Sequence, residues 1–155
     1  MDIRISPARF PEDAETVRGL FREYERGLEA DLCFQGFEAE LAALPGVYAA
    51  PAGRVLLAWV DGEAVGCGAF KDLGEGICEM KRLFVRPTTR GLGLGRRLCD
   101  DLLDAARAQG YVRMRLDTLD RLAAALALYQ QLGFRPVPAY YANPLQGVVY
   151  LERPL

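Results

Sequence analysis

The segment RPTTRGLGLGRR, residues 86–97, places three glycines and a cluster of arginines between an apolar run and a helix-like one. Helices usually begin with acidic residues, because the exposed amide groups of the first turn carry partial positive charge. Cations at this position therefore indicate an anionic ligand. Glycines let successive backbone amides converge on a pyrophosphate at the positive end of the helix, and Arg90 and Arg96 can add charge-assisted hydrogen bonds.

Two familiar phosphate motifs do not account for this segment. The dinucleotide fingerprint GxGxxG fails because Gly91 and Gly93 are followed by Gly95, and the Gly-Lys-Ser/Thr of a P-loop does not occur in the chain. An ordinary structural explanation also exists, since Arg96 and Arg97 each precede an aspartate by four residues and can pair with it along a helix. This segment alone does not decide whether the arginines bind phosphate or form surface ion pairs.

Glu79 is a second candidate for chemistry, because it stands inside the apolar run ICEMKRLFV at residues 77–85. A carboxylate within an apolar strand is unfavourable unless it is paired or functional, and a positioned carboxylate can accept a proton in catalysis. The alternatives are an ion pair with Lys81 or Arg82, or exposure at the edge of the sheet.

Composition limits the remaining classes of function. The chain has 155 residues, a formal net charge of -2 and no histidine, and its four cysteines form no CxxC pair. These features disfavour general affinity for nucleic acid or membranes, zinc sites, disulfide frameworks and catalysis by Ser-His or Cys-His pairs. We therefore expect one domain over residues 1–155 with no metal. Because no apolar run is long enough to span a membrane and the start lacks a signal core, we also expect a cytoplasmic protein.

Hydrophobic periodicity gives the order of elements that must position these residues. The pattern predicts strands at 2–6, 54–60, 63–70, 77–85, 112–117 and 148–155, and helices at 12–29, 37–44, 94–109 and 120–134. The two strands at 54–70 are joined by Asp61-Gly62, a hairpin signal. This order indicates an α/β sandwich with a mixed sheet.

The strand at 77–85 changes its alternation partway along. Cys78 and Met80 are apolar at even positions, whereas Leu83 and Val85 are apolar at odd ones. A strand can shift its parity only by gaining a residue, so the pattern predicts a β-bulge near Lys81–Leu83. If helices cover both faces of the sheet, apolar residues are expected at even and odd positions alike, and the change does not indicate a bulge. A bulge would leave a backbone N–H unpaired and directed outward.

Residues 80–111, MKRLFVRPTTRGLGLGRRLCDDLLDAARAQGY, resemble the acyl-CoA-binding segment of the GNAT N-acetyltransferase superfamily. The family's mark is a strand ending in V-x-P, then [Q/R]xxGxG/A at the start of a helix. ALALYQQLGF, residues 125–134, resembles its second motif, A-x-x-L-Y-x-x-x-G-F. The predicted element order agrees from residue 2 to 155. The resemblance implies a mostly antiparallel sheet of six or seven strands with about four flanking helices.

The resemblance also implies acetyl-CoA as the cofactor. Main-chain groups of Leu83, Phe84 and Val85 would pair with the pantetheine arm and polarise the thioester carbonyl. The pyrophosphate would bind to the loop formed by Arg90, Gly91, Leu92, Gly93, Leu94 and Gly95, with Arg96 following. The asparagine that many relatives place seven residues before the motif tyrosine is Leu122 here, so its contact to pantetheine is either lost or supplied by Asp117 or Thr118.

Two catalytic roles follow from the same resemblance. Tyr129 matches the general acid that protonates the departing thiolate, although Leu122, Leu126 and Leu132 place it on a helical stripe typical of a core residue. Glu79 would take the proton of the attacking amine, directly or through water. A domain that binds acyl-CoA without catalysis is the main alternative, and a nucleotide-binding domain is a weaker one.

Acceptor sites in this family vary, and no shared motif identifies the substrate. We expect the acceptor to be the primary amine of a small molecule or peptide. Candidate contacts come from two loops that offer polar and aromatic side chains, although ordinary loop packing explains each of them equally well: Asp31, Phe34, Gln35, Tyr140, Tyr141 and Asn143. Asp31 could hold an ammonium group. The resemblance also allows a homodimer, but no segment identifies an interface.

Overall fold

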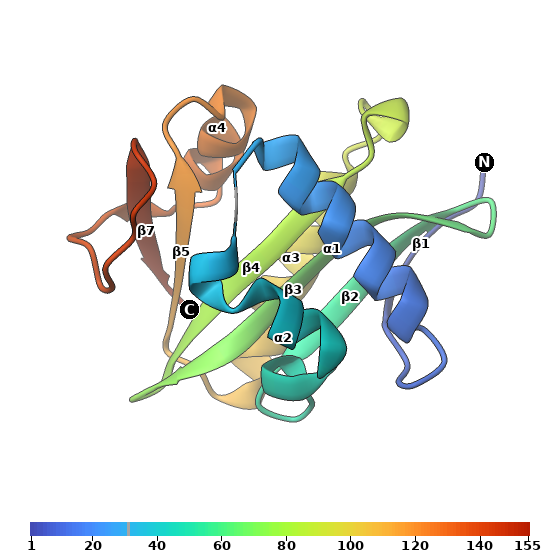
Figure 1. Cartoon of the computed structure of the whole chain (residues 1–155), viewed down its shortest axis with the longest axis horizontal. Helices are drawn as coiled ribbons and strands as arrows, with labels where there is room; N and C mark the ends of the chain where they lie inside the picture. Colours follow the sequence, from blue (N-terminus) through green and yellow to red (C-terminus); the bar gives the residue numbers. More distant parts are fainter. Residues whose placement is uncertain (31) are drawn as a thin grey trace.

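The protein is described by a computed structural model covering residues 1–30 and 32–155, without the side chain of Phe34 (Figure 1). The helices are α1 (Ala14–Leu28), α2 (Phe37–Ala42), α3 (Leu94–Gln109) and α4 (Ala123–Gln131), with 3₁₀ turns at Cys33–Gln35, Gly46–Tyr48 and Pro87–Thr89. The strands are β1 (Ile3–Pro7), β2 (Arg54–Val60), β3 (Glu63–Gly74), β4 (Ile77–Val85), β5 (Arg113–Leu119), β6 (Arg135–Pro136) and β7 (Val148–Pro154).

In the described residues, all seven strands form one sheet in the order β1-β2-β3-β4-β5-β7-β6. Every neighbouring pair is antiparallel except β4 and β5, which are parallel. Figure 1 shows α1 and α2 over one face of the sheet and α3 behind the other. The predicted mixed, mostly antiparallel sheet with four flanking helices is therefore confirmed. No helix in the described part of the chain is both long and apolar enough to cross a membrane.

The alternation of β2 explains why helices cover both faces. Val55 and Leu57 are buried against α1 and α2, whereas Leu56 and Ala58 are buried against α3. Both sets are apolar because neither face of the central strands is left to solvent. The helices meet them with matching apolar stripes, such as Leu98 and its neighbours on α3.

The expected helix at 120–134 is shorter than its sequence pattern. It begins at Ala123, after a turn in which the Leu122 amide donates to the Leu119 carbonyl. Its end at Gly133, where φ is +90°, is as predicted.

The predicted bulge in β4 is present. Ala69 of β3 lies opposite Lys81 and Cys67 lies opposite Phe84, so β4 has one residue more than β3 over this stretch. Arg82 has a left-handed backbone with φ of +62°. The extra residue keeps Leu83 on the α3 side, where Met80 already packs, and sends Phe84 to the α1 side.

The same bulge sends the Arg82 side chain into the layer between the sheet and α2. Arg82 is only 2% exposed, and its guanidinium donates to both Glu40 oxygens at 2.9 and 2.8 Å. It also lies 5.1 Å from the ring centroid of Phe37. A buried guanidinium needs this pairing, because an uncompensated charge in a dry interior is strongly unfavourable.

We expect Glu40→Ala to lower the free energy of unfolding by about 3 kcal/mol, because it leaves the Arg82 charge buried without a partner. Glu38→Ala is the matched control: Glu38 lies on the same helix and also pairs with an arginine, Arg22, but its side chain is 70% exposed. The control should leave stability nearly unchanged. Urea unfolding measures both, and equal losses would contradict a structural role of the buried pair.

Candidate functional site

The two parallel strands at the centre of the sheet separate partway along. Ile77, Cys78 and Glu79 of β4 pair with residues 113–115 of β5, and the pairing ends there. Beyond this point β4 remains paired with β3, and β5 remains paired with β7. Main-chain groups of β4 that point towards β5 after Glu79 therefore have no strand partner. The bulge lies within this open stretch, as do Leu83, Phe84 and Val85.

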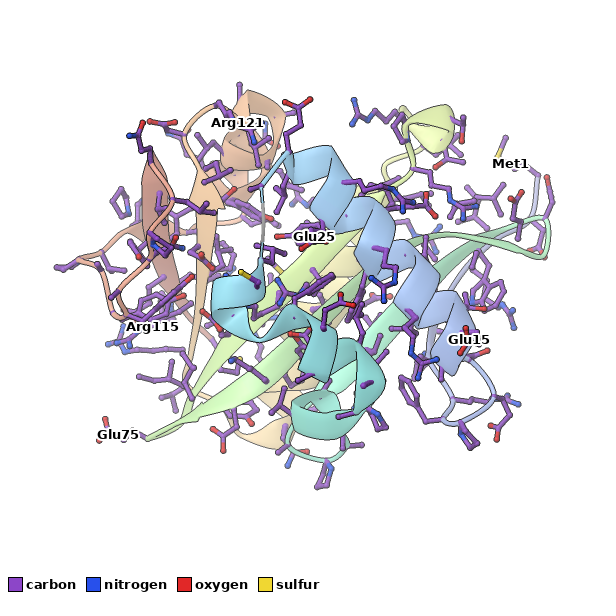
Figure 2. All side chains as sticks on the ribbon, viewed as in Figure 1. Met1, Glu15, Glu25, Glu75, Arg115 and Arg121 are labelled. Carbon is purple, nitrogen blue, oxygen red and sulfur yellow. The ribbon has the colours of Figure 1, made fainter. Side chains whose placement is uncertain are left out.

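A first cavity, with a volume of ≈ 90 Å³, lies where β4 and β5 separate. The ends of α1 and α4 contribute to its walls, and its lining residues include Tyr24, Met80, Leu83, Thr118, Leu122 and Tyr129. Arg121, just before α4, donates to the Leu28 carbonyl at the end of α1 and so links the two helices that border this cavity (Figure 2).

The glycine-rich loop presents unpaired amides at the start of α3. Gly93, with φ of +72°, is the N-cap, and the first turn holds no acidic residue and no side-chain cap. Leu94, Gly95 and Arg96 occupy this turn, so their amides have no intrahelical acceptor. The Arg90 amide is different, because it donates to the Pro87 carbonyl at 3.3 Å. Arg90 therefore has only its exposed side chain to offer to an anion.

Of the two arginines expected to pair with an aspartate along the helix, one does so. Arg96 lies 3.4 Å from Asp100, and both side chains are about half exposed. Arg97 makes no ion pair with any described residue. An exposed pair of this kind is weak, so it does not prevent Arg96 from binding a phosphate.

Tyr129 has features both of a core residue and of a general acid. It is 7% exposed, and its ring packs edge-on against Phe134 with centroids 5.9 Å apart, as a core residue would. Its hydroxyl, however, makes no hydrogen bond with any described residue, and the side chain lines the first cavity. Burial raises the pKa of this phenol well above its ordinary value, so it stays protonated at neutral pH. The preceding Leu128 lies beside Gly95, so α4 runs close to the start of α3.

A second cavity, of ≈ 280 Å³, adjoins the first and contains Glu79. Glu79 is 3% exposed, and its Oε2 accepts a hydrogen bond of 2.6 Å from the Tyr140 hydroxyl. Its Oε1 lies 3.8 Å from the Lys71 ammonium and 3.9 Å from that of Lys81. Of the expected alternatives, pairing with Lys81 is thus realised, whereas Arg82 turns to Glu40 and exposure does not occur.

The predicted acceptor residues divide between the two cavities. Tyr140 and Tyr141 line the second, Asn143 lines the first, and Gln35 lines both. Tyr141 donates to Asp117 at 2.5 Å, and Asn143 donates to the Tyr141 hydroxyl at 2.9 Å. Asp31 and the side chain of Phe34 lie outside the described residues.

Sequence reasoning missed Lys71 and Tyr24, and it gave Lys81 only as an ion-pair partner of Glu79. Lys71, Lys81 and Tyr24 carry no motif, yet the lysines line the second cavity and Lys81 and Tyr24 line the first. Burial lowers the pKa of Lys81, and the nearby Arg82 charge lowers it further. One compositional signal existed: of the 19 cationic residues, Lys71 and Lys81 are the only lysines. Asp117, one of the two residues that could supply the pantetheine contact, lines the first cavity and accepts a hydrogen bond from Tyr141.

Comparison with known proteins agrees with this geometry. The family model described as acetyltransferase (GNAT) family matches residues 15–134. An uncharacterised N-acetyltransferase of Schizosaccharomyces pombe is 41% identical over 153 residues, which cover 97% of this chain and 94% of the relative.

Solved structures share the fold. A GNAT-family acetyltransferase of Staphylococcus aureus superposes with a TM-score of 0.82 at 20% identity, over 99% of both chains. The paia N-acetyltransferase of Thermoplasma acidophilum, solved in complex with coenzyme A, has a TM-score of 0.78 at 18% identity, over 100% of both chains. With a family model across most of its length and a relative of 41% identity over nearly all of it, the chain belongs to the acetyltransferase (GNAT) family.

Proposed function

We propose that the protein transfers the acetyl group of acetyl-CoA to the primary amine of a small molecule or peptide, by direct attack within a ternary complex. The separation of β4 from β5 carries this proposal. It leaves an unpaired main-chain edge beside a cavity that is also lined by Tyr129, a protonated phenol with no hydrogen bond to any described residue. Such an arrangement can bind an extended chain as an added strand, stabilise charge on a carbonyl oxygen and deliver a proton at one place.

The residues present fit acetyl-CoA. The amides of Leu94, Gly95 and Arg96 suit a pyrophosphate, and the side chains of Arg90 and Arg96 add positive charge at the same helix start. The open edge at Leu83–Val85 suits the amide groups of a pantetheine arm. The coenzyme A complex of the paia N-acetyltransferase supports this assignment by similarity of fold. When bound, acetyl-CoA supplies a thioester whose carbonyl carbon the amine attacks.

The chain contributes to this reaction by positioning and charge stabilisation. The unpaired main-chain N–H groups at the bulge stabilise the negative charge that develops on the carbonyl oxygen, an effect of roughly 3 kcal/mol at comparable sites. Holding the amine and the thioester together also removes the bimolecular encounter. No cysteine is needed as a nucleophile: Cys67, Cys78 and Cys99 are buried, and burial raises the pKa of each thiol.

Two proton transfers complete the proposal. Tyr129 gives its phenolic proton to the departing sulfur and regains one from solvent. The attacking nitrogen loses one proton as the amide bond forms, and Glu79 is the acceptor at the end of that path. Because Tyr140 already donates to Glu79, its hydroxyl can pass its own proton to the carboxylate while it takes the amine's proton.

The cofactor assignment predicts a specific effect of charge in the glycine loop. Acetyl-CoA at roughly 100 times its Kd should stabilise the wild type by about 2.7 kcal/mol, which corresponds to a rise in Tm of about 5 to 10 °C. Gly93→Asp should abolish this rise, because a carboxylate would repel the pyrophosphate. Gly93→Asn is the matched control. Asp and Asn both tolerate the left-handed backbone at position 93, but only Asp is charged.

Thermal shift assays with acetyl-CoA, CoA, ATP and NAD test this assignment. Equal loss of the shift in both variants would mean that shape and not charge matters at position 93. No shift of the wild type with millimolar acetyl-CoA would remove the basis of the proposed function.

The assignment of Tyr129 as the general acid predicts that Tyr129→Phe lowers kcat roughly 10²- to 10⁴-fold without weakening acetyl-CoA binding. Folding should be unaffected, because the hydroxyl has no hydrogen bond to lose among the described residues. Since the pKa of Tyr129 is raised well above its ordinary value, wild-type kcat should show no alkaline loss from this phenol below about pH 10.

HPLC measurement of CoA release over an amine panel tests this role, and Tyr24→Phe is the control because Tyr24 lines the same cavity. A loss confined to Tyr24→Phe would transfer the role to Tyr24. Tight acetyl-CoA binding with no turnover of any amine by the wild type would favour the non-catalytic binding domain.

A further inference from the structure

The lysines of this chain lie at one place only. Lys71 on β3 and Lys81 on β4 are the only lysines among 19 cationic residues, and both line the second cavity. Their ammonium groups approach the same oxygen of Glu79, at 3.8 and 3.9 Å. Every other cation of the chain is an arginine. The two point charges are therefore concentrated where an acceptor substrate would enter.

The charges that line this cavity do not balance. Glu40 is neutralised by Arg82, which donates to both of its oxygens. Glu79 is then the one remaining carboxylate among the described residues that line this cavity, and it faces two ammonium groups. Among the side chains that line this cavity one positive charge is left over; the Asp117 carboxylate, which raises the pKa of Lys81, lines the adjoining first cavity. An anionic ligand would compensate this positive charge.

The lysines also have hydrogen-bond donors to spare. Lys81, whose side chain is 8% exposed, donates to the Gln35 side-chain oxygen at 2.9 Å and makes no other hydrogen bond with a described residue. Lys71 makes none at all with the described residues, and its side chain is 32% exposed. Each ammonium has three N–H groups, so both can donate to the two oxygens of one carboxylate.

A negative charge, the carboxylate of Asp117, lies on the side of the first cavity. Asp117 lines that cavity, next to the point where β4 and β5 separate. Gln35 and Lys81 line both cavities, so the two spaces adjoin along these side chains. A molecule with an anion at one end and an amine at the other matches this polarity, with its amine on the side of the thioester.

We propose that Lys71 and Lys81 form an anion subsite for the acceptor, and that the acceptor is an amino acid or a similar small molecule carrying both a carboxylate and the amine to be acetylated. This inference rests on the proposed acetyl transfer and names its substrate class. An acceptor bound through a second ammonium group, such as a polyamine, would meet like charges at Lys71 and Lys81. The rings of Tyr140 and Tyr141, which line the second cavity, would enclose the rest of the acceptor. Arg115, labelled in Figure 2, stacks on Tyr140 with its guanidinium carbon 5.2 Å from the ring centroid.

The test compares matched acceptors that differ only in the anion. The standard L-amino acids, β-alanine and γ-aminobutyrate are each assayed with acetyl-CoA against their amides, with kcat/KM taken from HPLC of CoA release. We expect the preferred acid to exceed its amide roughly 10- to 100-fold. The amide has the less basic amine and is intrinsically the better nucleophile at neutral pH, so this preference would oppose simple reactivity.

Lys71→Gln should reduce the preference, which is the ratio of kcat/KM for the acid to kcat/KM for its amide, to within about 3-fold. Arg113→Gln is the matched control, because it removes one positive charge from a half-exposed side chain on β5 outside both cavities. The control should keep the preference. Wild-type turnover of amides equal to that of acids would overturn the anion subsite, and so would binding of acetyl-CoA with no turnover of any acid in the panel.

A second measurement does not depend on turnover. An amine-acetylating reagent labels lysines according to their access, and peptide mass spectrometry resolves Lys71 from Lys81. The N-acetyl product of the fastest acid should protect Lys71 in the presence of CoA, whereas the N-acetyl product of its amide should not. If neither N-acetyl product protected Lys71, the anion subsite would be contradicted. Failure of the proposed function itself would appear separately, as the absence of a thermal shift with acetyl-CoA.

Discussion

The extra residue in β4 is the constraint on which the rest of the site depends. It turns Arg82 towards α2, where Glu40 holds it, and it keeps Leu83 and Val85 on the α3 side of the sheet. Gly68 stands opposite the bulge, and a Cβ there would lie 2.9 Å from a methyl group of Leu102. A side chain at position 68 would thus require Leu102 of α3 to shift, so α3 packs closely on the sheet beside the bulge. The extra residue thus sets both the packing of these side chains and the course of the open edge of β4.

The separation of β4 and β5 can persist because both strands are paired elsewhere. β3 supports β4 through the bulge, while β7 pairs with β5 along its whole length. The cavity between them is therefore bordered by two strands that are each paired on their other side, and loop residues such as Asn143 complete its wall. A catalytic group on such a frame is held in place before substrate binds, which is what charge stabilisation and proton delivery require. Tyr129 gains the same benefit from its edge-on contact with Phe134.

Local patterns predicted the parts of this site that are local in the chain. The glycine loop, the parity change in β4 and the motif around Tyr129 each lie within a few residues, so their meaning could be read directly. The lysine pair could not be found in this way, because it depends on the register that sets Lys71 opposite Glu79. The Tyr141–Asp117 contact likewise joins a loop without periodicity to a distant strand end. Glu79 was recognised as unusual, but two of its partners come from the neighbouring strand and from a distant loop.

The contrast between Arg82 and the two lysines explains how one small region serves both stability and binding. Arg82 meets Glu40 with its planar fork, and the bidentate contact satisfies both groups. An arginine at position 71 or 81 could close on Glu79 in the same way, and its N–H donors would then be taken up by the carboxylate and not by a ligand. A lysine ammonium instead is a point charge on a flexible stem, and here it remains beyond hydrogen-bond distance of the carboxylate. The structural pair is thus complete in itself, whereas the cluster at Glu79 becomes complete only with an added anion.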